Sequence, residues 1–341
     1  MNETRFMETL KTLIDIDSAT GQYHEIEEYL IDELERMGYE PETLNKGGII
    51  CCLGGNGNPL CITAHADTLG LMVRHINEDG TIKVVKVGGL YAYNCEQENV
   101  RIHTRDKGIV TGTVRRKESS VHVTPDEKWD EVPDFEKNVI VMVDADVKNA
   151  DDVRDLGIEV GDYINLDPRF TCQNGYIKSR FLDDKAMLAI MLEGARELKE
   201  KNVSLSRKVY IHIAMYEEIG HGGSFIPEDT RDFIAMDIAC TGKEQTSSEK
   251  KVSVFCKDSR FPYHIDIIDE MIDCAKDKGL DYVCDIFTPH YGTDADPALA
   301  AGYDIRHGAF GPGITSSHGY ERTHIDGIKN TYGLFMGLIQ K

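Results

Sequence analysis

The sequence has little positive charge and no long apolar stretch. It contains 38 Lys and Arg against 59 Asp and Glu, which gives a formal net charge of -21 at pH 7. A chain with this charge repels phosphate backbones and anionic membrane surfaces, so we expect neither nucleic acid nor a membrane as a partner. No run approaches the roughly 20 apolar residues that span a bilayer. Residues 1–13 mix charged and apolar side chains and lack the apolar core of a signal peptide.

Cysteine is present, but not in an arrangement that staples a fold or binds a metal. The nine cysteines are an odd number, none of them form a Cys-x-x-Cys pair, and the only adjacent pair is Cys51-Cys52. This usage is typical of thiols in a reducing compartment, not of a disulfide framework or a zinc knuckle. The sequence therefore predicts a cytoplasmic protein.

The length of 341 residues suggests about two domains. Residues 1–69 and 168–341 alternate helical patterns with short apolar strands, which is typical of an α/β domain with a mostly parallel mixed sheet flanked by helices. Residues 70–167 instead carry short strands separated by turn signals, which predicts a small all-β domain inserted into the α/β domain. Within this insert, residues 115–138 are polar and contain two prolines, so we expect a mobile or interface-forming loop.

Residues 214–223 (AMYEEIGHGG) run from a strand into two adjacent carboxylates and then into glycines. Residues 208–216 (KVYIHIAMY) are almost uninterruptedly apolar and β-branched, which predicts a central strand buried on both faces. In open α/β sheets, functional groups gather beyond the carboxyl ends of such strands. Because successive residues that leave a strand point in opposite directions, Glu217 and Glu218 should have different tasks, one as a metal ligand and one as a base.

Side chains of the metal-binding type stand at further strand ends and helix starts. The set is His65, Asp183, Glu218, Asp237 and His318. Each of them alone is as readily a structural histidine or a helix cap. Together, two imidazoles and three carboxylates suit two zinc-type ions that share one bridging acid. Asp67 follows His65 by two residues in an extended segment and is placed to hold the second ring nitrogen of His65.

Five motifs follow one another along nearly the whole chain. They are residues 65–73 (HADTLGLMV), 182–185 (LDDK), 217–220 (EEIG), 236–237 (MD) and 292–295 (GTDA). In order and spacing, this series resembles that of the tetrahedral (TET) and glutamyl aminopeptidase family of di-metal metallopeptidases. The resemblance implies a zinc-aminopeptidase-like catalytic domain, an inserted β-barrel-like domain for oligomerisation or substrate access, two divalent ions and often a dodecameric shell. The C-terminal part also resembles a bacterial subgroup encoded beside osmolyte-dipeptide genes, which points to a small modified dipeptide as substrate.

The resemblance also implies a role for each site residue. Asp183 bridges the two metals, His65 and Asp237 complete one site, Glu218 and His318 complete the other, and Glu217 is the general base. Zinc is the expected metal, with cobalt and manganese as alternatives. In residues 318–324 (HGYERTH) the acid comes one residue earlier than in the family pattern, which makes His324 a rival for the last ligand. Motif position, after the glycine-rich residues 311–313, favours His318.

These residues predict a metal-dependent aminopeptidase that acts as a homo-oligomer. Two cations lower the pKa of a bound water to about 7, and Glu217 takes its proton and returns it to the leaving amine. The backbone N–H groups of Gly222 and Gly223 are candidates to assist the oxyanion. An N-acyl amino-acid deacylase or dipeptidase needs the same metals and base and is the alternative. A glycosidase with paired carboxylates would leave the histidines without a task, and a non-catalytic scaffold would need neither ligands nor base.

Overall fold

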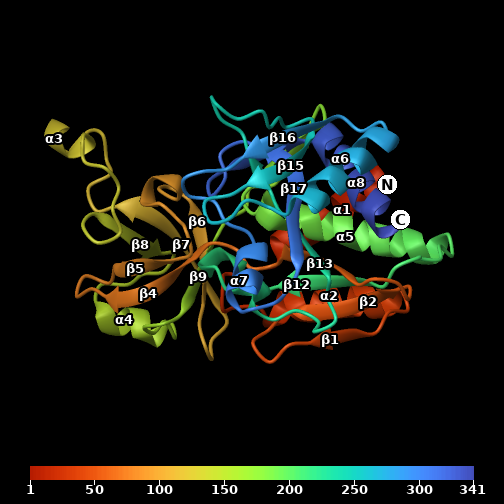
Figure 1. Cartoon of the computed structure of the whole chain (residues 1–341). Helices are drawn as coiled ribbons and strands as arrows, with labels where there is room; N and C mark the ends of the chain where they lie inside the picture. Colours follow the sequence, from red (N-terminus) through yellow and green to blue (C-terminus); the bar gives the residue numbers. More distant parts are fainter. The chain divides into compact units, whose positions relative to one another are not determined.

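The computed structural model describes residues 1–341 and divides into two compact units. One unit combines Met1–Asp67 with Arg169–Lys341, and the other is Thr68–Pro168. The sequence analysis placed the corresponding boundaries after residues 69 and 167. Figure 1 shows the elements of both units coloured along the chain.

The larger unit is built on one mixed β-sheet whose central strands run parallel (Figure 1). Neighbouring strands follow the order β1-β2-β12-β3-β13-β17-β15-β16, and β14 pairs with β17. The strands from β12 to β17 in this order are parallel, whereas β2 pairs antiparallel with β12 and β15 pairs antiparallel with β17. This architecture confirms the predicted α/β class. The strands are β1 Pro41–Thr43, β2 Ile49–Gly54, β3 Leu60–His65, β12 Val209–Ala214, β13 Asp232–Met236, β14 Ala239–Cys240, β15 Val252–Lys257, β16 Tyr282–Ile286 and β17 Arg306–Ile314.

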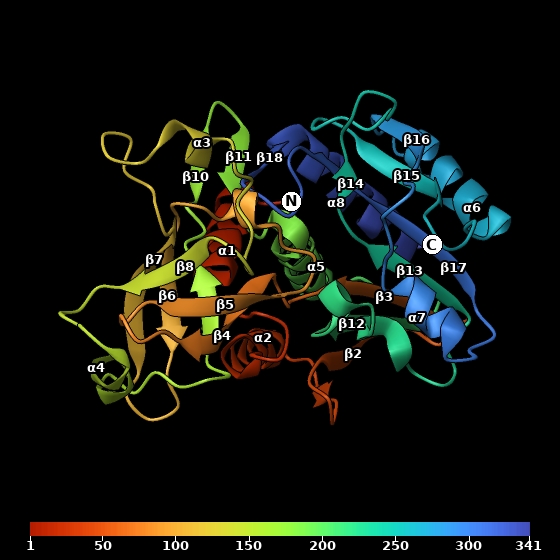
Figure 2. The same cartoon turned by 90° about the vertical axis from the view of Figure 1, so that its left-hand side faces the viewer.

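Helix α5 (Leu182–Glu200) is the central helix of this unit. It packs against α1 and α8 and contacts strand β3 (Figure 2). Every residue from Leu182 to Ala195 is buried, and the buried residues include the charged Asp183, Asp184, Lys185 and Glu193. The start of α5 therefore lies in the interior, and Asp183 with it. The other helices of the unit are α1 Glu3–Asp15, α2 His24–Arg36, α6 Ile265–Asp277, α7 Ala295–Ala300 and α8 Ile325–Ile339.

A separate three-stranded sheet joins two parts of the larger unit that are far apart in the sequence. Strand β11 (Tyr176–Ser179) pairs antiparallel with β10 (Thr171–Gln173) and with β18 (Glu321–His324). Because β11 leads into α5, its pairing with β18 brings the loop that carries His318 next to Asp183. The sequence analysis assigned no strand to these three segments, nor to β15 and β16.

The smaller unit is a closed antiparallel barrel, which confirms the predicted β-barrel-like insert. Its strands follow one another in the order β4-β5-β8-β7-β6-β9, and β4 closes the barrel against β9 (Figure 1). Residues 115–138, expected as a loop, contain the short helix α3. The elements are β4 Gly70–Ile76, β5 Ile82–Val87, η1 Ala92–Asn94, β6 Asn99–His103, β7 Ile109–Arg116, α3 Asp126–Trp129, β8 Val139–Val143, α4 Ala150–Asp155 and β9 Tyr163–Leu166.

Two compositional features of the sequence have structural counterparts. All nine cysteines carry free thiols, including the neighbours Cys51 and Cys52. None of the helices combines the length and the apolar character that crossing a bilayer requires.

Candidate active site

The segments that carry the predicted ligands meet at one edge of the large sheet. Strand β3 ends at His65, β12 ends shortly before Glu217, and β13 ends directly before Asp237. Because these strands run parallel, their carboxyl ends lie at the same edge, and Ala214 of β12 pairs with His65. Helix α5 starts there and delivers Asp183.

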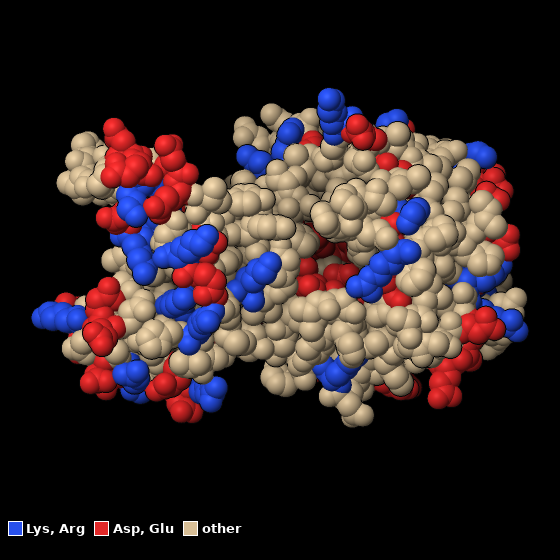
Figure 3. Space-filling view, turned by 60° about the vertical axis from the view of Figure 1, so that its left-hand side comes forward, with Lys and Arg blue, Asp and Glu red and all other residues tan.

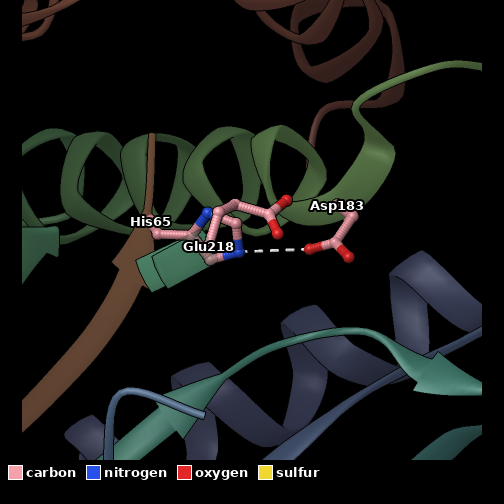
Figure 4. Close-up of side chains that lie close together, drawn as sticks. All are labelled: His65, Asp183 and Glu218. Atoms are coloured by element: carbon pink, nitrogen blue, oxygen red, sulfur yellow. Dashed lines mark hydrogen bonds and ion pairs between the residues drawn. The ribbon is translucent and has the colours of Figure 1, made fainter. Parts of the chain in front are cut away.

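Asp183 lies between two imidazoles. Its Oδ1 is 3.1 Å from His65 Nε2, and its Oδ2 is 3.7 Å from His318 Nε2. Figure 4 shows the contact between His65 and Asp183, with the Glu218 carboxylate beside them. Glu218 Oε2 in turn lies 3.6 Å from His318 Nε2. The structure therefore brings four of the five predicted ligands into one cluster around Asp183.

The fifth predicted ligand, Asp237, belongs to a second group that also contains Asp183. Its other member is Asp184, and the carboxylate oxygens of the three acids lie within 4.8 Å of one another. All three side chains are buried. Asp184 Oδ2 accepts a hydrogen bond from the His65 N–H at 3.0 Å, whereas its Oδ1 has no hydrogen-bond partner. Sequence reasoning did not assign Asp184 to the site, although it directly follows Asp183.

Asp67 contacts His65 in a different way from the one predicted. The backbone carbonyl oxygen of Asp67 lies 2.9 Å from His65 Nδ1, while its carboxylate oxygen is 3.6 Å away. Nδ1 donates its proton to this carbonyl, so Nε2 is the ring nitrogen that faces Asp183 and would hold a cation in place of its own proton. The carboxylate instead accepts the backbone N–H groups of Glu217 and Glu218 and the hydroxyl of Thr20. The Asp67 side chain thereby fixes the start of the Glu217-Glu218 turn.

Glu321 holds the backbone of two site residues in place, a role that the sequence analysis did not predict. Its Oε1 accepts the backbone N–H of His318, and its Oε2 accepts the backbone N–H of Asp183, both at 3.1 Å. This buried carboxylate thus joins the His318 loop to the start of α5. The only signal in the sequence is its place three residues after His318, the early acid that departs from the family pattern.

His324 lies outside the cluster. Its Nδ1 accepts the backbone N–H of Asp326 at 3.1 Å and caps helix α8, and its ring packs edge-on against Tyr176. These contacts give His324 a structural task, and the structure brings His318 rather than His324 to Asp183 and Glu218.

The backbone after the two glutamates forms two short turns, and one of its N–H groups is already hydrogen-bonded within the protein. Glu217–Ile219 and Gly222–Ser224 form two short 3-10 turns, η2 and η3. The N–H of Gly223 donates to Asp294 Oδ1 at 2.8 Å. The oxyanion role predicted for Gly223 is therefore wrong, because its only donor is already used inside the protein.

The site buries more carboxylates than cations. Burial raises the pKa of Glu217, Glu218 and Asp237 well above the usual range, because a low-dielectric interior disfavours the charged form. Burial also raises the pKa of Asp183, but the hydrogen bond and the charge of His65 outweigh it, and the net shift is downward. For His65, burial lowers the pKa, but the hydrogen bond to Asp183 and the negative charges of Asp184, Glu217 and Asp183 raise it well above its usual value.

Divalent cations fit this set of side chains. Carboxylates and neutral imidazoles are ligands that such ions prefer, and the oxygens of one group lie within 4.8 Å of one another. A bound cation would favour the ionised carboxylates that burial now disfavours. It would also give the unpartnered Asp184 Oδ1 a neighbour of opposite charge.

A cavity of about 200 Å³ opens onto these residues. Figure 3 shows a hollow in this face of the molecule with acidic side chains on its floor. The cavity is smaller than the about 300–1,000 Å³ of pockets for drug-sized ligands, which suits a single amino-acid residue. A larger cavity of about 680 Å³, beside residues 38–42, contains no group of metal-binding side chains. The lining residues of the smaller cavity are Asp183, Glu217, Glu218, Gly220, Asp237, Arg260, His290, Tyr291, Gly292, Thr293, Asp296, Pro297 and His318.

Metal-free protein is expected to lose thermal stability as the pH rises from about 4 to 7. Burial raises the pKa of Asp294 to about 6 and that of Asp296 to about 7, from the usual 3.8 of an exposed aspartate. Between the usual value of 3.8 and these raised values, the folded state binds more protons than the unfolded state, so a rise in pH favours unfolding. Added zinc should raise the Tm most at the upper end of this range. Melting curves of chelator-treated protein check this, and a Tm that rises over the same range would contradict it.

The comparisons with known proteins identify the family of the chain. The family model described as M42 glutamyl aminopeptidase matches residues 47–334, which is most of the chain. The protein YhfE of Bacillus subtilis (strain 168) is 37% identical over 338 residues, which cover 98% of this chain and 97% of YhfE.

Two solved structures share the fold over almost the whole length. The TET aminopeptidase from the marine sediment archaeon Thaumarchaeota archaeon SCGC AB-539-E09 superimposes with a TM-score of 0.90 at 19% identity, and covers 100% of this chain and 97% of that chain. The TET1 peptidase of Pyrococcus horikoshii has a TM-score of 0.86 at 21% sequence identity. The match covers 98% of this chain and 99% of that chain. The family model and the similarity to YhfE together show that the chain belongs to the M42 glutamyl aminopeptidase family and is an aminopeptidase.

Proposed function

We propose that two divalent cations, zinc by preference, bind on either side of Asp183. His65 and Asp237 would complete one site, and Glu218 and His318 the other. The two oxygens of Asp183, one directed to each imidazole, support two sites, and the 3.6 Å between Glu218 and His318 supports the pairing of these two residues. Glu218 also belongs to a group with His65 and Asp183 whose ligand atoms lie within 4.8 Å of one another. Asp184 lies close enough to Asp237 to be a further ligand of the first cation. Cobalt and manganese suit the same donors.

Glu217 is the proposed general base. Its carboxylate lines the cavity, its Oε2 lies 3.8 Å from His65 Nε2, and its side chain is 14% exposed. When bound, the cations would supply Lewis acidity that lowers the pKa of water from 15.7 to about 7. Glu217 would accept the proton of the attacking water and pass it to the amine that leaves. Its backbone N–H, held by Asp67, keeps the carboxylate at this position.

The proposed substrate is a peptide with a free amino group, down to a small modified dipeptide. The observation that carries this proposal is a cavity of about 200 Å³ that combines the acid cluster with room for about one residue. A protonated amino group is attracted to the carboxylates at this floor, and a neutral one can donate its lone pair to a bound cation. An acetylated nitrogen carries no charge, and its lone pair is delocalised into the carbonyl group. An N-acyl deacylase would need an additional acyl pocket.

The test of this proposal is the release of the N-terminal residue from a panel of dipeptides and longer peptides, unblocked and N-acetylated. We expect cleavage of unblocked peptides alone, and loss of activity after chelation with recovery on zinc addition. Cleavage of the acetylated series alone would instead establish the deacylase. Activity that survives complete metal removal would contradict the metal-dependent mechanism.

Substitution of His318 by alanine is expected to lower kcat/KM by at least about 10–100-fold, the loss that even indirect partners of metal ligands cause. The matched control is His324→Asn, which keeps a side-chain acceptor for the Asp326 N–H and lies outside the cluster. It should retain full activity. Zinc stoichiometry measured on both variants after dialysis should fall for His318→Ala alone, and the reverse pattern would assign the last ligand to His324.

We further propose that the enzyme is a homo-oligomer and that the inserted barrel takes part in its assembly. The supporting observation is the fold that it shares with TET1 of Pyrococcus horikoshii, a peptidase that can assemble into a tetrahedron or a large octahedral shell. Sedimentation velocity at several protein concentrations should then give a species of about twelve times the 38.3 kDa subunit. A monomer at every concentration would refute the proposal.

A further inference from the structure

The turn after the two glutamates is hydrogen-bonded to the ammonium group of Lys46 on one side and to the carboxylate of Asp294 on the other. On one side, Lys46 Nζ donates to the carbonyl oxygens of His221 and Gly222 at 2.6 and 3.1 Å, and to the hydroxyl of Ser224 at 2.7 Å. On the other side, the Gly223 N–H donates to Asp294 Oδ1. The two charged groups therefore hold opposite sides of one short turn.

This turn is hydrogen-bonded directly to the segment that carries the glutamates. The Gly220 N–H donates to the carbonyl oxygen of Glu217 at 2.6 Å, and the His221 N–H donates to that of Tyr216 at 2.9 Å. A displacement of the turn would therefore pass to the backbone of Glu217 and Glu218. Asp67 holds this segment only through the two N–H groups at its start.

There is no free space between the turn and Asp294. A Cβ atom on Gly222 would lie 2.1 Å from Asp294 Oδ1, and one on Gly223 would lie 1.9 Å from the Asp294 carbonyl oxygen. Only glycine allows this approach. The turn consequently takes its position from Asp294, because the two backbones are in direct contact.

Asp294 is itself held by a buried chain of hydrogen bonds. Its Oδ2 lies 3.3 Å from the Thr63 hydroxyl, and this hydroxyl lies 2.9 Å from His212 Nδ1. If Thr63 donates to Asp294, it accepts the proton of His212 Nδ1, and His212 Nε2 is then unprotonated. Burial lowers the pKa of His212 to about 3, so the ring is neutral, and Nε2 has no hydrogen-bond partner. The chain is therefore ordered from His212 through Thr63 to Asp294.

We propose that Asp294, braced by Thr63 and His212, is a positioning residue that holds the Gly220–Ser224 turn and thereby keeps Glu217 and Glu218 at their working positions. The inference rests on the proposed roles of Glu217 as base and Glu218 as ligand. It gives a task to the residues 292–295 motif, which lies outside the metal cluster.

The test compares Asp294→Ala with Asp294→Asn. Alanine removes the acceptor of the Gly223 N–H, so kcat should fall about 10–100-fold with KM changed less, and zinc should bind more weakly. Asparagine keeps the acceptor for the Gly223 N–H. Its amide can donate to Thr63 when Thr63 donates to His212 Nδ1, and the proton of His212 then lies on Nε2. Asparagine should therefore restore kcat and the zinc Kd to within about 3-fold of the original enzyme, which a general packing defect would not allow.

Two further variants keep the inference testable if Asp294→Ala does not fold. Thr63→Val removes the donor to Asp294 Oδ2 and should lower kcat, whereas Thr63→Ser should not. The control is Asp232→Asn, another buried acid, which binds Arg306 at the opposite end of β13. It should lower the Tm without changing kcat or the zinc Kd.

Equal kcat and zinc Kd in Asp294→Ala and the original enzyme would overturn the inference. Equal damage in Asp294→Ala and Asp294→Asn would overturn it as well. If the original enzyme cleaves no peptide, the proposed function fails, and the zinc Kd values of the same variants still decide the positioning role.

Discussion

Substitution of Glu217 by glutamine is expected to lower kcat by about 10²–10⁴-fold, the usual contribution of a general base. Glutamine has nearly the same shape and keeps the backbone N–H that donates to Asp67, but it cannot accept a proton. KM and zinc content should change little, because Glu217 is not a proposed ligand. Initial-rate kinetics on an unblocked dipeptide, with the zinc content measured on the same sample, give the comparison.

The matched control for this change is Glu228→Gln, which alters an exposed glutamate a few residues after the turn. It should behave as the original enzyme. If Glu217→Gln loses both zinc and activity, Glu217 is a ligand and the base must be sought elsewhere. A fully active variant would remove Glu217 from the mechanism.

Substitution of Asp183 by asparagine is expected to remove both cations at once. Asp183 is the only residue common to both groups of metal-binding side chains, and its two oxygens face different imidazoles. An amide offers one neutral oxygen, so it cannot bridge two cations, and two imidazoles lose their charged partner. Zinc per subunit after dialysis should fall from two to near zero, and kcat/KM should fall to background.

His318→Ala provides the contrast for Asp183→Asn. It removes a ligand from one proposed site only, so about one zinc per subunit should remain. If Asp183→Asn also retains one zinc, Asp183 belongs to a single site and does not bridge. If it retains two, Asp183 is not a ligand.

The fold is predictable from sequence where the signal is local. Helices such as α8 and the strands of the barrel follow from the spacing of apolar residues, and the central strand β12 from its uninterrupted apolar run. The pairing of β11 with β18 joins residues about 145 positions apart, and neither segment carries a local strand pattern. Strand β16 is half exposed at the sheet edge, and for this reason lacks the apolar run that marks β12.

In the candidate site, too, the sequence indicates the residues with a local signal and misses those that depend on long-range contacts. His65, Glu218 and Asp237 lie at or shortly after the ends of strands, a position that sequence can indicate because parallel strands end at one edge. Glu321 accepts the backbone N–H of Asp183 and Asp294 accepts that of Gly223, both from distant segments, and no spacing in the sequence encodes such a contact. The partners of the Asp67 carboxylate are hidden from the sequence for the same reason, because Glu217 and Glu218 lie 150 and 151 residues away and Thr20 lies 47 residues away.

The central claim is that one buried cluster binds two cations around Asp183. The most direct measurement is anomalous X-ray diffraction at the zinc edge from crystals grown with zinc. We predict two peaks about 3.5–4 Å apart on either side of the Asp183 carboxylate, with His65 and His318 bound to different ions. A single peak, or a second peak at His324, would contradict the account.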